Sequence, residues 1–139
     1  MSKNVFFLFF LFYTKLFSYQ WTIFLYMAAD NDLHTAAIED IIEMQKGLLD
    51  LSDNVDIIVY IDHIPAYKNG KVEYLKIKPS NANEITSEIL RSYPDEDSGK
   101  GETLTKFLDW AIPRFSSEAR TNSCAIWASK LLRLWSLVK

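Results

Sequence analysis

Cysteine and histidine are scarce in this sequence of 139 residues, which has one cysteine and two histidines. The single cysteine, Cys124, excludes an intramolecular disulfide bond, and no spacing of histidine and cysteine indicates a zinc site. Glycine and proline number only four each, and 49% of the residues are hydrophobic, which is typical of a globular domain. The length suits one domain and lies near the lower limit for a complete α/β enzyme.

Clustered positive charge is also missing. The sequence has 15 basic and 18 acidic residues, and without residues 1–18, which hold Lys3 and Lys15 but no acids, the balance becomes 13 to 18, a net charge of −5. Nucleic acids and anionic lipids are bound through clusters of basic residues. We therefore expect neither as a partner.

The N-terminus holds an uninterrupted apolar run, from Val5 to Tyr13, preceded by Lys3. This pattern predicts a secretory signal peptide at Met1–Ser18, and therefore a protein that is secreted, periplasmic or at the cell surface. A retained membrane anchor is the competing interpretation, but the run stops at Thr14, short of the ~20 apolar residues that span a bilayer. No cysteine follows the run, so a lipoprotein is not expected.

The stretch from Trp21 to Gly47 predicts a strand followed by a helix. Trp21 to Met27 is a short apolar run, as expected of a strand that is covered on both faces. Lys46 and Gly47 suit the end of the helix. The apolar residues from Leu33 onward recur at steps of four and three, which predicts an amphipathic helix: Leu33, Ala37, Ile41, Met44 and Leu48.

Further buried strands are predicted at Val55–Ile61 and Ser123–Ala128, and a second helix at Glu102–Phe115. A strand, a helix and a strand joined by short links predict parallel neighbours with a right-handed crossover. The alternating pattern of Val72–Lys78, after the hairpin signal Asn69-Gly70, predicts a half-exposed strand at a sheet edge. For Glu84–Tyr93 the sequence leaves a short helix and a strand open.

Four polar residues follow the first two predicted strands: Asp30, Asp32, Asp62 and His63. Ligands bind at the carboxyl ends of the strands in open α/β sheets, so these residues are candidates for the rim of a cleft. Helix capping and a strand-end turn explain Asp30 and Asp32 without a ligand, whereas a bound cation needs carboxylates in fixed geometry. His63 is expected to be solvated or to cap a turn.

Two other residues have the chemistry of a peptidase but not its expected setting. Cys124 lies inside an apolar strand, where a thiol packs as a small hydrophobic group rather than acting as a nucleophile. His34 falls in the first turn of the first predicted helix and is expected to be exposed. No catalytic, cofactor-binding or metal-binding residue is assigned from the sequence.

Three motifs resemble the opening of the clostripain family of cysteine peptidases. They are W-T-I-F-L-Y-M-A-A-D-N-D-L at Trp21–Leu33, A-A-I-E-D at Ala36–Asp40 and E-T-L-T-K-F-L-D-W at Glu102–Trp110, and the resemblance extends to Trp127. It implies an α/β fold of the caspase–haemoglobinase kind, in three α/β/α layers with a mostly parallel sheet that is incomplete here. It further implies a secreted endopeptidase that cuts proteins or peptides after Arg or Lys, with calcium needed in some members.

The resemblance also implies where the catalytic residues of such a peptidase are found. The family's histidine follows the third core strand in a pattern like L-W-x-H-G-x-G-W, and its cysteine follows the fourth strand. Here Ser129 stands where that histidine is expected, and no glycines follow. We therefore expect residues 19–128 to be the N-terminal part of the peptidase domain and residues 129–139 to be an aberrant tail, produced by a frameshift or a truncated gene.

Two further hypotheses stay open. A second polypeptide that carries the missing histidine and cysteine would make this chain its structural partner. Alternatively, the chain is a non-catalytic secreted module that binds a protein or peptide through the predicted edge strand Val72–Lys78. In either case, the polypeptide by itself is expected to be inactive.

Overall fold

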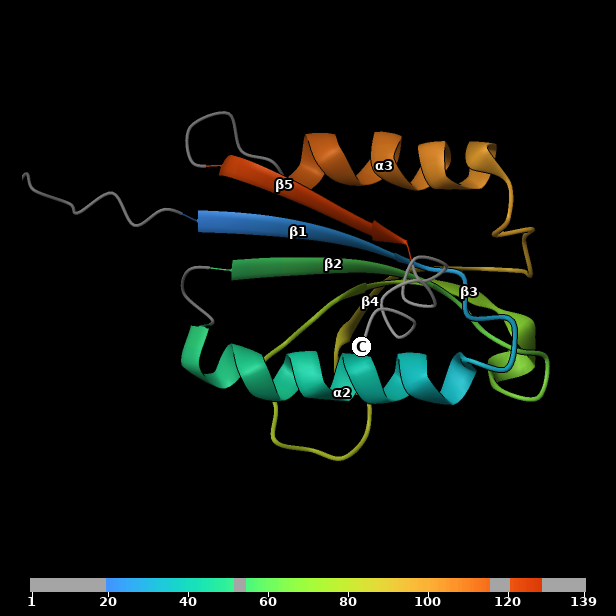
Figure 1. Ribbon diagram of the computed structural model, residues 1–139, viewed down its shortest axis with the longest axis horizontal. Coiled ribbons are helices and arrows are strands. Elements are labelled where there is room, and N and C mark those ends of the chain that lie inside the picture. The colour runs from blue at the N-terminus through green and yellow to red at the C-terminus, as the bar shows by residue number, and fades with distance from the viewer. Residues whose placement is uncertain (1–19, 52–54, 116–120, 129–139) are drawn as a thin grey trace, which may run out of the picture.

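A computed structural model describes residues 20–51, 55–115 and 121–128 of the chain. The predicted signal peptide at Met1–Ser18 and the predicted tail at 129–139 lie outside these residues. The elements are β1 (Gln20–Met27), α2 (His34–Leu51), β2 (Val55–Asp62), the 3₁₀ turn η1 (Lys68–Gly70), β3 (Val72–Lys76), β4 (Glu88–Tyr93), α3 (Gly101–Phe115) and β5 (Thr121–Ala128). The strands form one five-stranded sheet in the order β4-β3-β2-β1-β5, with α2 below it and α3 above it in Figure 1.

The centre of the sheet is parallel, as the sequence predicts. β1 pairs with β2 in a continuous register from Trp21 opposite Val55 to Met27 opposite Ile61. β5 pairs with the other side of β1, also in parallel. β3 is antiparallel to both β2 and β4, so β4 runs in the same direction as β1, β2 and β5. Four of the five strands therefore end at the same edge of the sheet.

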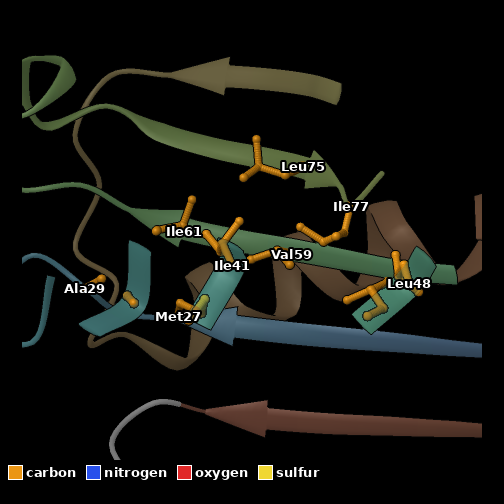
Figure 2. Packing of buried hydrophobic residues seen from close by; sticks show 10 residues of the cluster. Met27, Ala29, Ile41, Leu48, Val59, Ile61, Leu75 and Ile77 are labelled. Carbon is orange, nitrogen blue, oxygen red and sulfur yellow. The ribbon is translucent and has the colours of Figure 1, made fainter. Parts of the chain in front are cut away.

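Each face of the sheet packs on one helix. The side chains of β2 alternate between the two faces, so Ile57, Val59 and Ile61 meet α2 while Ile58 and Tyr60 meet α3. The α2 face holds the residues drawn in Figure 2, which are Met27, Ala29, Ile41, Leu48, Val59, Ile61, Leu75 and Ile77 among others. The α3 face is aromatic, with Phe24, Tyr26, Tyr60, Tyr74 and Phe107. This is the predicted three-layer α/β/α arrangement.

The predicted edge strand at Val72–Lys78 is wrong. β3 lies between β2 and β4, and four of its five residues are buried. The edge strand on this side of the sheet is β4, at the end of the stretch for which the sequence left a helix and a strand open, and its residues are mostly exposed. A partner therefore has no free β3 edge to bind, which removes the hypothesis of a binding module that uses Val72–Lys78.

Gln45 of α2 explains why the chain returns to form β4. Its buried carboxamide donates a hydrogen bond to the carbonyl of Glu84 (2.9 Å). The carboxamide oxygen accepts hydrogen bonds from the N–H of Thr86 (2.9 Å) and from Oγ of Ser87 (2.7 Å). These bonds hold the segment before β4 against α2, from where β4 pairs with β3.

α2 is longer than predicted. It continues through Gly47 to Leu51, because Leu48 is buried against the sheet on the same face as Ile41. Burial of a leucine contributes more than the ~1 kcal/mol that a glycine costs inside a helix. In the described residues no helix combines the length and the apolar character needed to cross a membrane.

The turn between β2 and β3 contains the predicted Asn69-Gly70 hairpin signal. Lys68, Asn69 and Gly70 have φ values of 51°, 58° and 64°, in the left-handed region. Asparagine and glycine adopt this region more readily than other residues. The reversal sends β3 back along β2, with Val72 opposite Asp62.

Candidate functional site

Three aspartates meet at the carboxyl edge of the sheet. Asp30 follows β1, Asp62 ends β2 and Asp95 follows β4. One carboxylate oxygen from each lies within 4.8 Å of the others. The three strands run in the same direction, which is why residues so far apart in sequence come together. Asp32, also predicted at this rim, does not belong to the group.

Asp62 is the buried member of this group. Its residue is 1% exposed, and its Oδ1 has no hydrogen-bond partner in the described part of the chain. Burial raises the pKa of this carboxyl to about 6, against the lowering effect of a hydrogen bond with Ser98, and the charges of Asp30 and Asp95 raise it further. Asp62 is thus a carboxylate held where ionisation is costly. Asp30 and Asp95 are exposed.

The loop that carries Asp95 is fixed by several contacts. The Tyr26 hydroxyl, from β1, donates a hydrogen bond to the carbonyl of Ser98 (2.9 Å). The next two acids of the loop are already paired, Glu96 with Lys106 and Asp97 with Lys100. Asp95 is in no ion pair among the described residues, and the same holds for Asp30 and Asp62. The three carboxylates therefore face one another without a neutralising side chain.

A tight turn positions Asp30. The side-chain oxygen of Asn31 accepts a hydrogen bond from the N–H of Leu33 (2.8 Å), and its amide donates to the carbonyl of Ala28 (2.7 Å). Asn31, between the predicted capping residues Asp30 and Asp32, thus makes these bonds just before the first turn of α2. Asp30 sits inside this turn, where the backbone direction is fixed on both sides.

The two histidines of the sequence lie together on the other face of the sheet. His63 is fully buried and His34 is 5% exposed, so the predictions of a solvated His63 and an exposed His34 are wrong. Nε2 of His34 is 3.1 Å from Nδ1 of His63, and Nε2 of His63 is 3.2 Å from Oε2 of Glu73. Lys68 donates to the same Glu73 oxygen at 2.7 Å. Side-chain alternation puts His63 on the α2 face, opposite to Asp62.

The charge of Glu73 sets the proton positions in this network. Burial alone raises the pKa of Glu73, but hydrogen bonds from His63 and Lys68 outweigh it and lower the pKa below the usual range. An ionised Glu73 accepts a hydrogen bond from the N–H at His63 Nε2, which leaves His63 Nδ1 to accept a hydrogen bond from His34 Nε2. Burial, followed by the nearby His63, lowers the pKa of His34, although Asp30 opposes this shift. Both imidazoles are therefore committed to internal hydrogen bonds.

Cys124 lies far from both histidines. Its backbone pairs with Thr22, which in turn pairs with Asp56 of β2. His63 directly follows β2, seven residues after Asp56, which corresponds to roughly 23 Å at ~3.3 Å per residue. A hydrogen bond between an imidazole and a thiol needs close contact, so the described backbone brings no cysteine–histidine pair together.

Sequence reasoning missed two residues of these clusters, Asp95 and Glu73. Asp95 belongs to a polar loop whose position depends on β4, a strand that the sequence left undecided. Glu73 lies in the stretch Val72–Lys78, whose alternating pattern predicts a half-exposed strand rather than a buried carboxylate. The alternation of side chains along β3 indicates the burial of Glu73. Glu73 lies on the same face as Leu75 and Ile77, which pack toward α2.

Comparison with known proteins gives a family match and one curated relative. Residues 25–127 match the model of the Clostripain family. Clostripain from Hathewaya histolytica is 28% identical over 112 residues, which cover 70% of this chain and 21% of that protein. The chain thus spans about a fifth of the length of this relative.

Two solved structures share the fold. A cysteine protease of B. fragilis superposes with a TM-score of 0.61 at 23% identity, over 78% of this chain and 86% of that chain. A secreted C11 cysteine protease from Bacteroides thetaiotaomicron, in complex with an irreversible peptide inhibitor, also gives 0.61, at 18% identity, over 78% of this chain and 28% of that chain. These matches confirm the predicted three-layer α/β fold of the caspase–haemoglobinase kind.

Proposed function

The chain belongs to the clostripain family, and from this membership we propose that residues 19–128 form the N-terminal part of a secreted cysteine endopeptidase domain that acts on proteins or peptides. The polypeptide of this sequence supplies the scaffold of the domain and does not cleave peptide bonds by itself. The catalytic histidine and cysteine come from a segment that is not encoded in these 139 residues.

The main support for inactivity is the position of the two histidines. A cysteine peptidase needs an imidazole in hydrogen-bond reach of its thiol. His63 and His34 are bonded to each other and to Glu73, and the backbone of Cys124 lies roughly 20 Å or more from the level of His63 along the strands. No other histidine or cysteine occurs in the sequence. Ser129, where the family pattern has histidine, lies outside the described residues.

An activity assay on the full chain tests this proposal. We expect no hydrolysis of fluorogenic peptides with Arg or Lys before the scissile bond. A chimera in which the residues after Trp127 are replaced by the segment that follows the matched region in Hathewaya histolytica clostripain should gain hydrolysis. A matched chimera with the supplied catalytic cysteine changed to alanine is the control. Hydrolysis by the original chain that is lost in Cys124→Ala contradicts the proposal.

A second polypeptide can supply the missing segment instead of a fusion. Co-expression with the catalytic segment as a separate chain should give a complex that cleaves the same peptides. A complex of verified composition without activity rejects this version.

Secretion is proposed from the apolar run at residues 5–13 and from the description of the B. thetaiotaomicron relative as secreted. Expression in a bacterial host should release the protein from the cytoplasm and remove an N-terminal segment ending near Ser18, as read by mass spectrometry. Leu8→Arg, which interrupts the apolar run, should retain the uncut chain inside the cell. Equal export of both forms contradicts a signal peptide.

A further inference from the structure

We propose that the outer edge of β4 and the adjoining side of α3 bind an extended acidic peptide. β4 is paired with β3 on one side only, so the backbone N–H and C=O groups on its other side have no partner among the described strands. An extended peptide can pair with such groups by adding a strand to the sheet. This edge is not the predicted one at Val72–Lys78, which β4 itself covers.

A row of alternating cationic and aromatic side chains lies where β4 meets α3. From α3 it contains Lys106, Trp110 and Arg114, which recur at steps of four and so share one side of the helix. From β4 it contains Arg91 and Tyr93, whose partners on β3 belong to the core on the α3 face. The guanidinium carbons of Arg91 and Arg114 lie 5.0 Å and 5.4 Å from the centre of the Trp110 ring. Nζ of Lys106 lies 4.9 Å from the centre of the Tyr93 ring.

The two arginines carry the unpaired charge of this row. Lys106 is already paired with an acid of the loop after β4. Arg91 and Arg114 form no ion pair with any carboxylate in the described part of the chain. Their hydrogen bonds go to neutral oxygens within the row, a tyrosine hydroxyl and a backbone carbonyl. A guanidinium group that stacks on an aromatic ring keeps N–H donors at its edge, and these donors match a carboxylate.

The other face of β4 is apolar at the same edge. Ile89 lies opposite Leu75, which packs on the α2 face, and Ile89 is 52% exposed. Successive side chains of a strand point to opposite faces of the sheet. An added strand with acidic residues at alternate positions would therefore place carboxylates beside Arg91 and Arg114 and apolar side chains beside Ile89. The surface does not depend on the peptidase proposal, because it uses only residues of this chain.

Binding of a labelled peptide to the full chain tests the charge of this surface. The probe is a short peptide of alternating glutamate and valine with a fluorescein label, and binding is measured by fluorescence anisotropy. We expect saturable binding that weakens at least about fivefold when NaCl rises from about 50 to about 300 mM, because the arginines are exposed and salt screens them. The same peptide with lysine in place of glutamate should not bind.

Strand addition is tested separately from charge. A peptide of alternating glutamate and proline has the same charge but lacks half of the N–H groups that a strand needs, so it should bind more weakly. Amide hydrogen exchange on the complex provides the second readout. The glutamate–valine peptide should slow exchange in β4 (Glu88–Tyr93), where the outer N–H groups gain partners.

Single variants locate the binding surface. Arg91→Gln and Arg114→Gln change exposed residues, and each should weaken binding of the glutamate–valine peptide at least about fivefold. The matched control is Lys71→Gln, which removes an exposed charge before β3 and should bind the peptide as the original chain does. Equal binding by the arginine variants and the original chain overturns the proposal. So does unchanged exchange in β4 on peptide binding, or equal affinity for a single-stranded DNA oligonucleotide of the same charge.

Discussion

At the scale of single residues, two buried carboxylates on opposite faces of the sheet have opposite electrostatic settings. Asp62 faces other acids and has an oxygen without a partner, so its pKa is raised to about 6. Glu73 faces His63 and Lys68, so its pKa is lowered despite burial. The first carboxylate costs stability when it is ionised, and the second contributes stability when it is ionised.

The first prediction concerns Asp62→Asn in the absence of divalent cations. The folded state holds a proton on Asp62 up to a pKa of about 6, while the unfolded chain loses it near the ordinary aspartate pKa of 3.8. Stability of the original chain therefore falls as the pH rises from about 4 to above 6. The variant has no charge to bury, so at pH 7 it should be more stable by on the order of 2–3 kcal/mol. The difference should shrink to near zero at pH 4.

Urea unfolding in EDTA at several pH values measures this difference. Asp56→Asn is the control, since Asp56 lies in the same strand but is partly exposed and paired with Lys76 at 2.9 Å. The control should not gain stability at pH 7. If Asp62→Asn is less stable than the original chain at pH 7 in EDTA, the ionised Asp62 carboxylate does not destabilise the fold as predicted.

The second prediction concerns Glu73→Gln. The change removes two charge-assisted hydrogen bonds, from His63 and Lys68, and should destabilise the fold by about 2–4 kcal/mol at pH 7. A lowered pKa contributes stability above the unfolded value of 4.5 that is lost as the pH falls through the folded value. The gap between variant and original should therefore close in acid. Denaturant midpoints across pH 3–7 provide the measurement.

Glu88→Gln is the matched control for Glu73→Gln. Glu88 pairs with Lys78 at 3.0 Å, but the two side chains are 52% and 45% exposed. Exposed ion pairs contribute about 0–1 kcal/mol. Equal destabilisation by the two changes would mean that the buried hydrogen bonds of Glu73 contribute no more to the free energy of unfolding than an exposed ion pair does.

The candidate site could be predicted only in part from sequence. Asp30 and Asp62 were found because they follow apolar strands, whose carboxyl ends meet at one edge by the rules of parallel sheets. Asp95 and Glu73 depend on β3 and β4, whose pairing is set by contacts between distant residues. The burial of His34 also depends on contacts between distant residues, because its ring packs on the rings of His63 and Tyr67, about thirty residues away. Local pattern holds no information on such contacts.

At the scale of elements, α2 continues past Lys46 and Gly47, where the sequence predicts its end, because Leu48 packs against the sheet.

The third prediction is that Gly47→Ala stabilises the protein by about 0.5–1 kcal/mol. Gly47 lies inside the helix, and a Cβ placed there has no atom within 4 Å, so alanine gains helix propensity without a clash. Thermal unfolding should record a rise in Tm. Gly70→Ala is the contrasting variant, with φ of 64°, and should lower the Tm. A lower Tm for Gly47→Ala would mean that position 47 does not remain helical.

Elements were predictable where burial is uniform and ambiguous where it is one-sided. β1 and β2 are mostly apolar, since α2 and α3 cover the two faces of the sheet, and their bounds agree with prediction within one residue. The apolar face of α3 predicts a helix at Glu102–Phe115, and the helix begins one residue earlier, at Gly101. β3 carries Glu73 and Lys76 among apolar residues, a pattern that indicates an exposed strand when it is considered alone. The cover supplied by β4 and the pairing of Glu73 with His63 reverse that conclusion.

At the scale of the whole molecule, the sheet has an ordered centre and a peripheral edge. β1 is paired on both sides, by β2 and β5, and it contributes Phe24, Tyr26 and Met27 to the two cores. β4 is paired only with β3, and its side chains are mostly exposed. Local opening is favoured where few buried contacts hold the backbone, so opening should begin at β4. The loop after β4 is linked to the centre of the sheet by the hydrogen bond from the Tyr26 hydroxyl of β1 to the carbonyl of Ser98 (2.9 Å).

The fourth prediction follows from this order of stability and uses amide hydrogen exchange on the full chain. Amides of β1 and β2 should exchange most slowly, and those of β4 and the loop at residues 94–100 should exchange faster. A β4 protected as strongly as β1 would contradict the assigned order of stability.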